Sequence, residues 1–217
     1  MSAELALRLT IAAAYLIVLV ELVALPIPSE ASTYAEWRRR RSTGARVMAG
    51  YAALLVVFGL PLAFVIHPPS FAHIPAAAEL PAFGRAAIAS GAIVTIAGAT
   101  VLGLVATLQL RRHRARTPTR LKTDGVFAYS RNPIVLSLHL TAIGSLAALP
   151  VLPLLIALPI YLLHMHTRIR LEEHQLLERC GAEFEAYRAE VLRYFGRVRL
   201  SRSQASAQAN RYGAPRS

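Results

Sequence analysis

A long uncharged stretch limits most strongly what this chain can fold into. Residues 133–165 contain no Asp, Glu, Lys or Arg over 33 positions. A single membrane-spanning helix needs only about 20 residues, whereas two ordinary spans with a turn need more than about 40. Two short helices fit if the chain breaks near Leu149-Pro150-Val151-Leu152-Pro153, because proline removes a helix donor and clashes with the preceding turn. The stretch therefore predicts a tight hairpin of apolar helices.

Three earlier segments are also apolar enough to cross a bilayer. Residues 9–27 are interrupted only by Glu21 and would reach about 28 Å as a helix, while residues 47–66 and 86–110 carry no charge. A cleaved signal peptide carries a basic cluster before its apolar stretch, but only one basic residue, Arg8, lies just before residues 9–27. A membrane span is therefore favoured over a signal peptide for this segment. With 55% apolar residues, the chain is predicted to be an all-α integral membrane protein of about five transmembrane helices.

The distribution of basic residues predicts the orientation in the membrane. Lys and Arg number 24 against 12 acidic residues, and they gather at 38–46, 111–131 and 168–216, whereas residues 67–84 contain none. Under the positive-inside rule the three basic segments lie in the cytosol, which places the amino terminus outside and the carboxyl terminus and active site inside. Arginine beside the bilayer meets anionic headgroups, so the positive charge requires no nucleic-acid partner.

The chain divides into three parts. Residues 1–110 are predicted to hold three membrane helices with a basic loop at 38–46. Residues 111–199 hold a polar loop, the hairpin and an amphipathic helix from about Thr167 to Phe195, in which apolar residues recur at helical spacing. Residues 200–217 are small and polar and predict a disordered tail. The one cysteine, Cys180, excludes an intramolecular disulfide.

Two polar segments flank the hairpin and are candidates for chemistry. In the first, residues 123–133, Asn132 and Pro133 suit the start of a helix, and Arg131 beside free backbone amides could hold a carboxylate or a ribose. In the second, Glu172 and Glu173 follow the hairpin directly, and because neighbouring residues diverge by about 100° on a helix, at most one of them faces inward. Each segment alone is also explained by helix capping or surface charge.

Histidines inside or beside the hairpin form a second group of candidates. His139 lies within the first hairpin helix, where an ionisable side chain is either functional or hydrogen-bonded to a neighbouring helix. His164 and His166 could suggest a metal together with His174, but residues two apart point away from each other on a helix. We therefore predict no metal site.

Taken together, the two polar segments resemble one family. They read Gly-x-Phe-x-x-x-Arg-Asn-Pro and, after the hairpin, Glu-Glu-x-x-Leu-x-x-x-Cys-Gly-x-x-Phe-x-x-Tyr-x-x-x-Val-x-Arg. This pattern, over about residues 118–195, is similar to the carboxyl-terminal half of the integral-membrane methyltransferases, which include isoprenylcysteine carboxyl methyltransferases and phospholipid N-methyltransferases. Asn132 stands where that family usually has His, and Val135 and Ser137 stand where it has Tyr and Gly.

The resemblance implies a site for S-adenosylmethionine between the hairpin and the carboxyl-terminal helix. It implies the catalytic residues Glu173 and Arg131, and it implies cofactor contacts from Gly125, Tyr129, Arg131, Asn132, Pro133, Glu172 and Glu173. A lipophilic acceptor entering from the bilayer would lie near the substrate-binding candidates His139, Tyr187 and Arg188. An amine acceptor would use a glutamate and a carboxylate acceptor would use an arginine, so both stay open. The alternatives are an NADPH-dependent sterol-type membrane reductase and an inactive membrane scaffold of the same fold.

Overall fold

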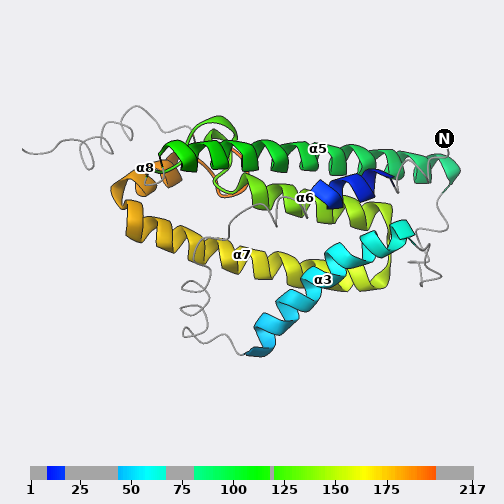
Figure 1. Cartoon of the computed structure of the whole chain (residues 1–217). Coiled ribbons are helices and arrows are strands. Elements are labelled where there is room, and N and C mark those ends of the chain that lie inside the picture. The colour runs from blue at the N-terminus through cyan, green and yellow to red at the C-terminus, as the bar shows by residue number, and fades with distance from the viewer. Residues whose placement is uncertain (1–8, 18–43, 67–80, 118–119, 199–217) are drawn as a thin grey trace, which may run out of the picture.

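The computed structural model describes residues 9–17, 44–66, 81–117 and 120–198 (Figure 1), and all its regular elements in these ranges are helices. Residues 9–17 are helical. The bounds of the remaining helices are α3 Gly44–Ile66, α5 Ala82–Arg116, the short 3₁₀ helix η1 Gly125–Ala128, α6 Pro133–Ala148, α7 Leu152–Cys180 and α8 Ala182–Glu190. Four segments lie wholly or mostly outside the described residues: the second part of the first predicted span, the basic loop at 38–46, residues 67–80 and the predicted tail.

The predicted hairpin is confirmed as a pair of helices that breaks at Leu149–Val151. Leu149 and Val151 are buried, and together with Leu154 they pack against partly buried residues of α3. Pro153 lies in the first turn of α7, where its missing N–H costs no helix hydrogen bond. The turn is thus set by an apolar contact with α3 and by proline positions that favour a new helix over continuation of the old one.

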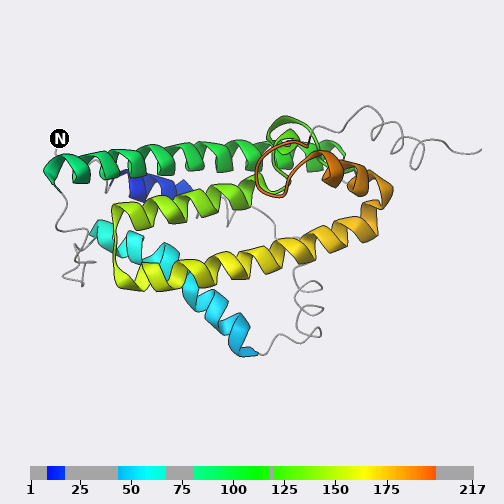
Figure 2. The same ribbon diagram turned by 180° about the vertical axis from the view of Figure 1, so that it is seen from behind.

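Helices α5 and α6 pack along each other over most of the length of α6, as Figures 1 and 2 show from opposite sides. Gly144 permits their close approach, because a Cβ at that position would lie 2.7 Å from Cγ1 of Ile96. Helix α7 instead diverges from α6 beyond the turn and packs mainly on α3 (Figures 1 and 2). The two hairpin helices are therefore close at the turn and separate toward the opposite end.

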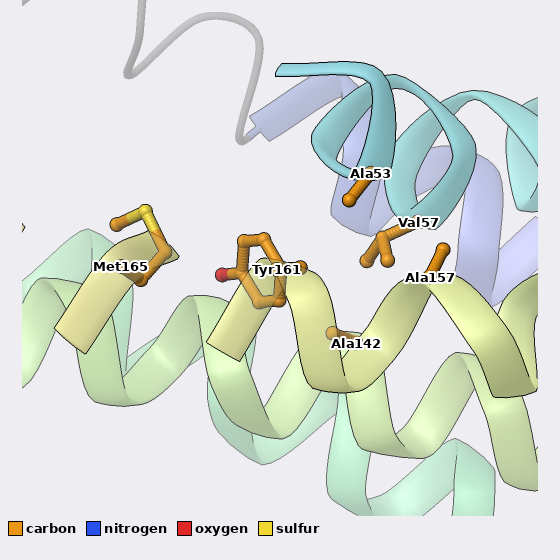
Figure 3. Packing of buried hydrophobic residues seen from close by; sticks show 6 residues of the cluster. All are labelled: Ala53, Val57, Ala142, Ala157, Tyr161 and Met165. Atoms are coloured by element: carbon orange, nitrogen blue, oxygen red, sulfur yellow. The ribbon is translucent and has the colours of Figure 1, made fainter. Parts of the chain in front are cut away.

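The core between α3, α6 and α7 consists of small residues around one large aromatic ring (Figure 3). Tyr161 is fully buried there, and the other members are Ala53, Val57, Ala142, Ala157 and Met165. Gly50 of α3 also lies against His164 of α7, and a Cβ at Gly50 would lie 2.1 Å from Nδ1 of that histidine. Small residues thus let α3 and α7 cross closely.

The predicted amphipathic helix is wrong in its bounds but right in its apolar face. Instead of a separate helix from Thr167 to Phe195, α7 continues without a break through Cys180, because no helix-breaking residue separates the hairpin from the charged part. Gly181, at φ 48°, then redirects the chain into α8, and the helix ends at Glu190. The predicted apolar residues of α8 do pack together, against Leu121, Leu176, Leu177 and Cys180.

Within the described residues, two helices are long and apolar enough to be able to cross a membrane, Phe83–Arg116 and Leu152–Cys180, and Met48–Ala63 and Pro133–Ala148 are shorter apolar helices. The carboxyl end of α5, η1 and α8 lie at one end of the molecule, and the hairpin turn lies at the other (Figure 1). The two predicted functional segments, before and after the hairpin, therefore meet at one end.

Candidate functional site

The loop before α6 is fixed by a glycine and by the end of α5. Gly125 has φ 65°, a conformation that favours glycine, and a Cβ there would lie 2.2 Å from Oε1 of Gln109. The backbone N–H of Val126 donates a hydrogen bond to that same oxygen at 3.1 Å. Gly125, predicted as a cofactor contact, thus serves to bring η1 against α5.

A buried tyrosine of α8 holds the same loop from the other side. The hydroxyl of Tyr187 donates to the carbonyl oxygen of Phe127 at 2.7 Å and lies 3.4 Å from that of Ser130. Burial raises the pKa of this phenol well above its ordinary value, so Tyr187 stays neutral and its hydroxyl remains a hydrogen-bond donor to the loop. Tyr187 is also a predicted substrate contact, and in the structure its hydroxyl connects α8 to the loop that carries Arg131.

Removing this hydroxyl should loosen the loop. We expect Tyr187→Phe to lower the free energy of unfolding by about 1–2 kcal/mol, because the Phe127 carbonyl loses its donor in a buried place. A thermal melt in detergent measures the change. Tyr129→Phe is the matched control because Tyr129 is exposed, and equal melting of both variants would contradict a bracing role for Tyr187.

Residues 191–198, here called the strap, return from α8 and bond to the loop before α6. The backbone N–H of Arg131 donates to the Leu192 carbonyl at 3.2 Å, and that of Gly196 donates to the Tyr129 carbonyl at 2.7 Å. Nδ2 of Asn132 donates to the carbonyl oxygen of Arg193 at 3.2 Å. Asn132 occupies the N-cap position of α6 but makes no capping bond with its side chain, because the amide holds the strap.

Glu173 lies at the centre of a charged cluster formed with Arg131 and Arg193. Its Oε1 is 3.1 Å from Nη1 of Arg131, and both its oxygens accept hydrogen bonds from Arg193, the shorter being 2.7 Å from Nη2. The side chains of Glu173 and Arg131 are 13% and 12% exposed, whereas that of Arg193 is 30% exposed. The carboxylate thereby joins α7, the loop before α6 and the strap.

The pKa values of Arg131 and Arg193 shift in opposite directions. Burial lowers the pKa of Arg131, with the charge of Glu173 opposing the change, whereas the hydrogen bond to Glu173 raises the pKa of the more exposed Arg193. Both guanidiniums remain charged, since arginine starts far above neutral pH. Two cations and one anion leave the cluster with a charge of +1, and Nε of Arg131 is buried and finds no hydrogen-bond partner among the described residues.

Aromatic and imidazole rings lie next to the charged cluster. The ring of His139 on α6 lies 5.6 Å from that of Tyr161 on α7 and 5.5 Å from that of Tyr194 on the strap, measured between centroids. Nδ1 of His166 is 3.0 Å from the Tyr194 hydroxyl. We call His139, Tyr161, His166 and Tyr194 the ring cluster. It connects the strap to the inner faces of both hairpin helices.

The remaining predicted site residues lie at the edge of this arrangement. Pro133 is buried at the start of α6, and Tyr129 is exposed. Glu172 is 47% exposed in its side chain and pairs with Arg168 at 3.7 Å. Arg188 pairs with Glu185 on the surface of α8 at 3.8 Å. Of the paired glutamates, Glu173 is therefore the one that faces the loop before α6.

Sequence reasoning missed Arg193 and Tyr194 as site residues. Both lie where the apolar spacing predicted a helix. They are brought to the site by the strap's backbone bonds to residues 129–131 and by side-chain bonds to Asn132, Glu173 and His166. Tyr161 was missed because a tyrosine in an apolar helix suggests core. The pattern that resembles the family ends with an arginine two positions after Val191. This residue, Arg193, was the one available signal of a further site residue.

No group of three metal-ligating side chains occurs in the described part of the chain. No protein-family model, curated protein or solved structure matches this sequence. The cluster of charge +1 can hold an anion, and both oxygens of Glu173 are occupied by guanidinium groups.

Proposed function

We propose that this chain is a membrane-embedded methyltransferase that uses S-adenosylmethionine and acts on a lipophilic acceptor. The observation that carries the proposal is the ion pair between Arg131 and Glu173, 3.1 Å apart and largely buried. These residues come from the two separate segments on which the family resemblance rests. A purely structural hairpin does not require that buried charges from both segments meet.

The cofactor's charged end suits the cluster in a specific way. The amino-acid end of S-adenosylmethionine carries a carboxylate, and Arg131 offers a buried Nε without a partner within the described residues. Arg131 and Arg193 would hold that carboxylate, while Glu173 keeps both guanidiniums in place. The bound cofactor would supply an electrophilic methyl group on a sulfonium. The protein's residues bind, orient and exclude water, which is what such a displacement needs.

Membrane insertion is part of the proposal. Exposed aliphatic side chains follow α5 and α7, namely Val94, Val101, Leu104, Leu108, Leu155, Ile156, Ile160 and Leu163, and aliphatic surface of this extent favours lipid contact. We propose five spans, with the arginine-rich end of α5, the strap and the site on the cytosolic side. A cysteine-accessibility map that places residues 111–117 and 190–198 on opposite sides would contradict this arrangement.

Calorimetric titration of S-adenosylhomocysteine into the detergent-purified protein tests the function, with NADPH titrated in parallel. We expect S-adenosylhomocysteine to bind and Arg131→Gln to weaken binding about 10-fold or more, because a charge-assisted contact is lost. Arg188→Gln, a surface arginine, is the matched control and should bind as the parent does. Binding of NADPH alone would favour a reductase, and binding of neither ligand by folded protein would favour a scaffold.

A further inference from the structure

Two polar atoms of the ring cluster are buried without a hydrogen-bond partner within the described ranges: Nε2 of His139 and the hydroxyl of Tyr161. His139 is 8% exposed and Tyr161 is fully buried. An unpaired buried polar group costs roughly 1–3 kcal/mol, so two of them in adjacent rings call for a bound group. Figure 3 shows the Tyr161 hydroxyl turned away from Val57 and Ala157, toward the Met165 side.

The charges around the ring cluster restrict what that group can be. The carboxylate that adjoins the rings, Glu173, is occupied by Arg131 and Arg193, so an ammonium group would have no free counter-charge. An anion would be held better by the arginines of the neighbouring cluster than by an imidazole and phenols. A neutral group fits the rings best, because it loses least on leaving water.

The two atoms also define a hydrogen-bonding pattern. The Tyr161 hydroxyl can donate, and Nε2 of His139 accepts in one tautomer and donates in the other. A hydroxyl group complements both, since it donates one hydrogen bond and accepts others. The surrounding rings of His139, Tyr161 and Tyr194 offer apolar surface to the carbon that bears it.

We propose that the ring cluster binds the neutral hydroxyl of a lipophilic alcohol or phenol, held between Nε2 of His139 and the Tyr161 hydroxyl. This deepens the proposed function, on which it rests: the methyl acceptor is then a hydroxyl oxygen, in place of an amine or a carboxylate. That oxygen would bond to the methyl carbon as the bond from this carbon to the sulfonium sulfur breaks, S-adenosylhomocysteine would leave, and the hydroxyl proton would pass to Nε2 of His139. Tyr194 of the strap covers the group and the hairpin helices flank it.

The experiment compares three probes with the same tail and different charges at pH 7.5: 4-octylphenol, 4-octylbenzylamine and 4-octylbenzoic acid. Each is titrated calorimetrically into the full-length protein in lipid nanodiscs, with empty nanodiscs subtracted. We expect the phenol to bind at least about 10-fold more tightly than the cation or the anion. Tyr161→Phe keeps the ring and removes only an unpaired hydroxyl, so it should fold at least as stably and bind the phenol about 5- to 10-fold more weakly.

His139→Phe should weaken phenol binding similarly, and His174→Phe, the matched control at an exposed histidine of α7, should leave it unchanged. Three results would overturn the proposal: equal binding of the three probes, preference for a charged probe, or unchanged phenol binding in Tyr161→Phe. Unchanged binding in Tyr161→Phe would mean that a trapped water, and no ligand hydroxyl, bonds to the two buried atoms. These titrations contain no cofactor. Failure of S-adenosylhomocysteine binding with phenol binding intact would therefore refute the methyltransferase and leave the hydroxyl site standing.

Discussion

Glu173→Ala is expected to lower the free energy of unfolding by about 2–4 kcal/mol, because it leaves two guanidiniums facing each other without their shared carboxylate. Breaking a buried ion pair by removing one partner costs about 3–5 kcal/mol, and the partial exposure of Arg193 reduces this somewhat. The unfolding midpoint in detergent measures the loss. S-adenosylhomocysteine binding should fall with it, since Arg131 is no longer held.

The neighbouring carboxylate gives a matched control for Glu173. Glu172→Ala removes a glutamate of the same helix turn whose partner Arg168 is 3.7 Å away on the surface, and such exposed pairs contribute about 0–1 kcal/mol. A double-mutant cycle of Glu173→Ala with Arg193→Ala should be clearly non-additive. Equal losses for Glu172 and Glu173, or additive losses in the cycle, would show that the charged cluster has no special energetic role.

Gly125→Ala is expected to destabilise the protein by about 2–3 kcal/mol. An alanine at φ 65° costs about 1–2 kcal/mol in backbone strain. Its Cβ would also displace the Gln109 side chain, which breaks the hydrogen bond to the Val126 N–H and costs about 1 kcal/mol more. The unfolding midpoint is again the measurement, and the loop carrying Arg131 should lose protection in hydrogen exchange.

Two other glycines separate the contributions at Gly125. Gly181 also has positive φ, at 48°, but an added Cβ meets nothing within 4 Å, so Gly181→Ala reports backbone strain alone. Gly98 is helical with equally open space, and alanine there should be neutral or stabilising by up to about 1 kcal/mol. If Gly125→Ala were no worse than Gly181→Ala, the contact with Gln109 would be irrelevant to stability.

The helices were largely predictable from the sequence, because charge and proline define them locally. The break at Leu149–Val151 followed from two prolines in an uncharged stretch, and the structure places the new helix at Leu152. The predicted helix through Phe195 failed because its end depends on distant partners: the strap leaves helical geometry to bond with residues 129–131. Hydrogen bonds between segments so far apart leave no periodic signal in either segment.

The candidate site was predictable in its parts and not in its connections. The sequence paired Glu172 with Glu173 and could not choose between them, since both lie next to the hairpin. The choice of Glu173 depends on how α7 is rotated relative to the loop before α6. The meeting of His139 with Tyr161 depends likewise on the register of α6 against α7, which apolar side chains set collectively.

The strap also determines when the site acquires its charge during synthesis. Arg193 follows Glu173 by 20 residues, an interval of roughly 1–4 s at ordinary translation rates. Before Arg193 is made, the members of the charged cluster already in the chain are Arg131 and Glu173, whose opposite charges cancel. The surplus positive charge of the cluster is thus contributed by the segment that closes the site.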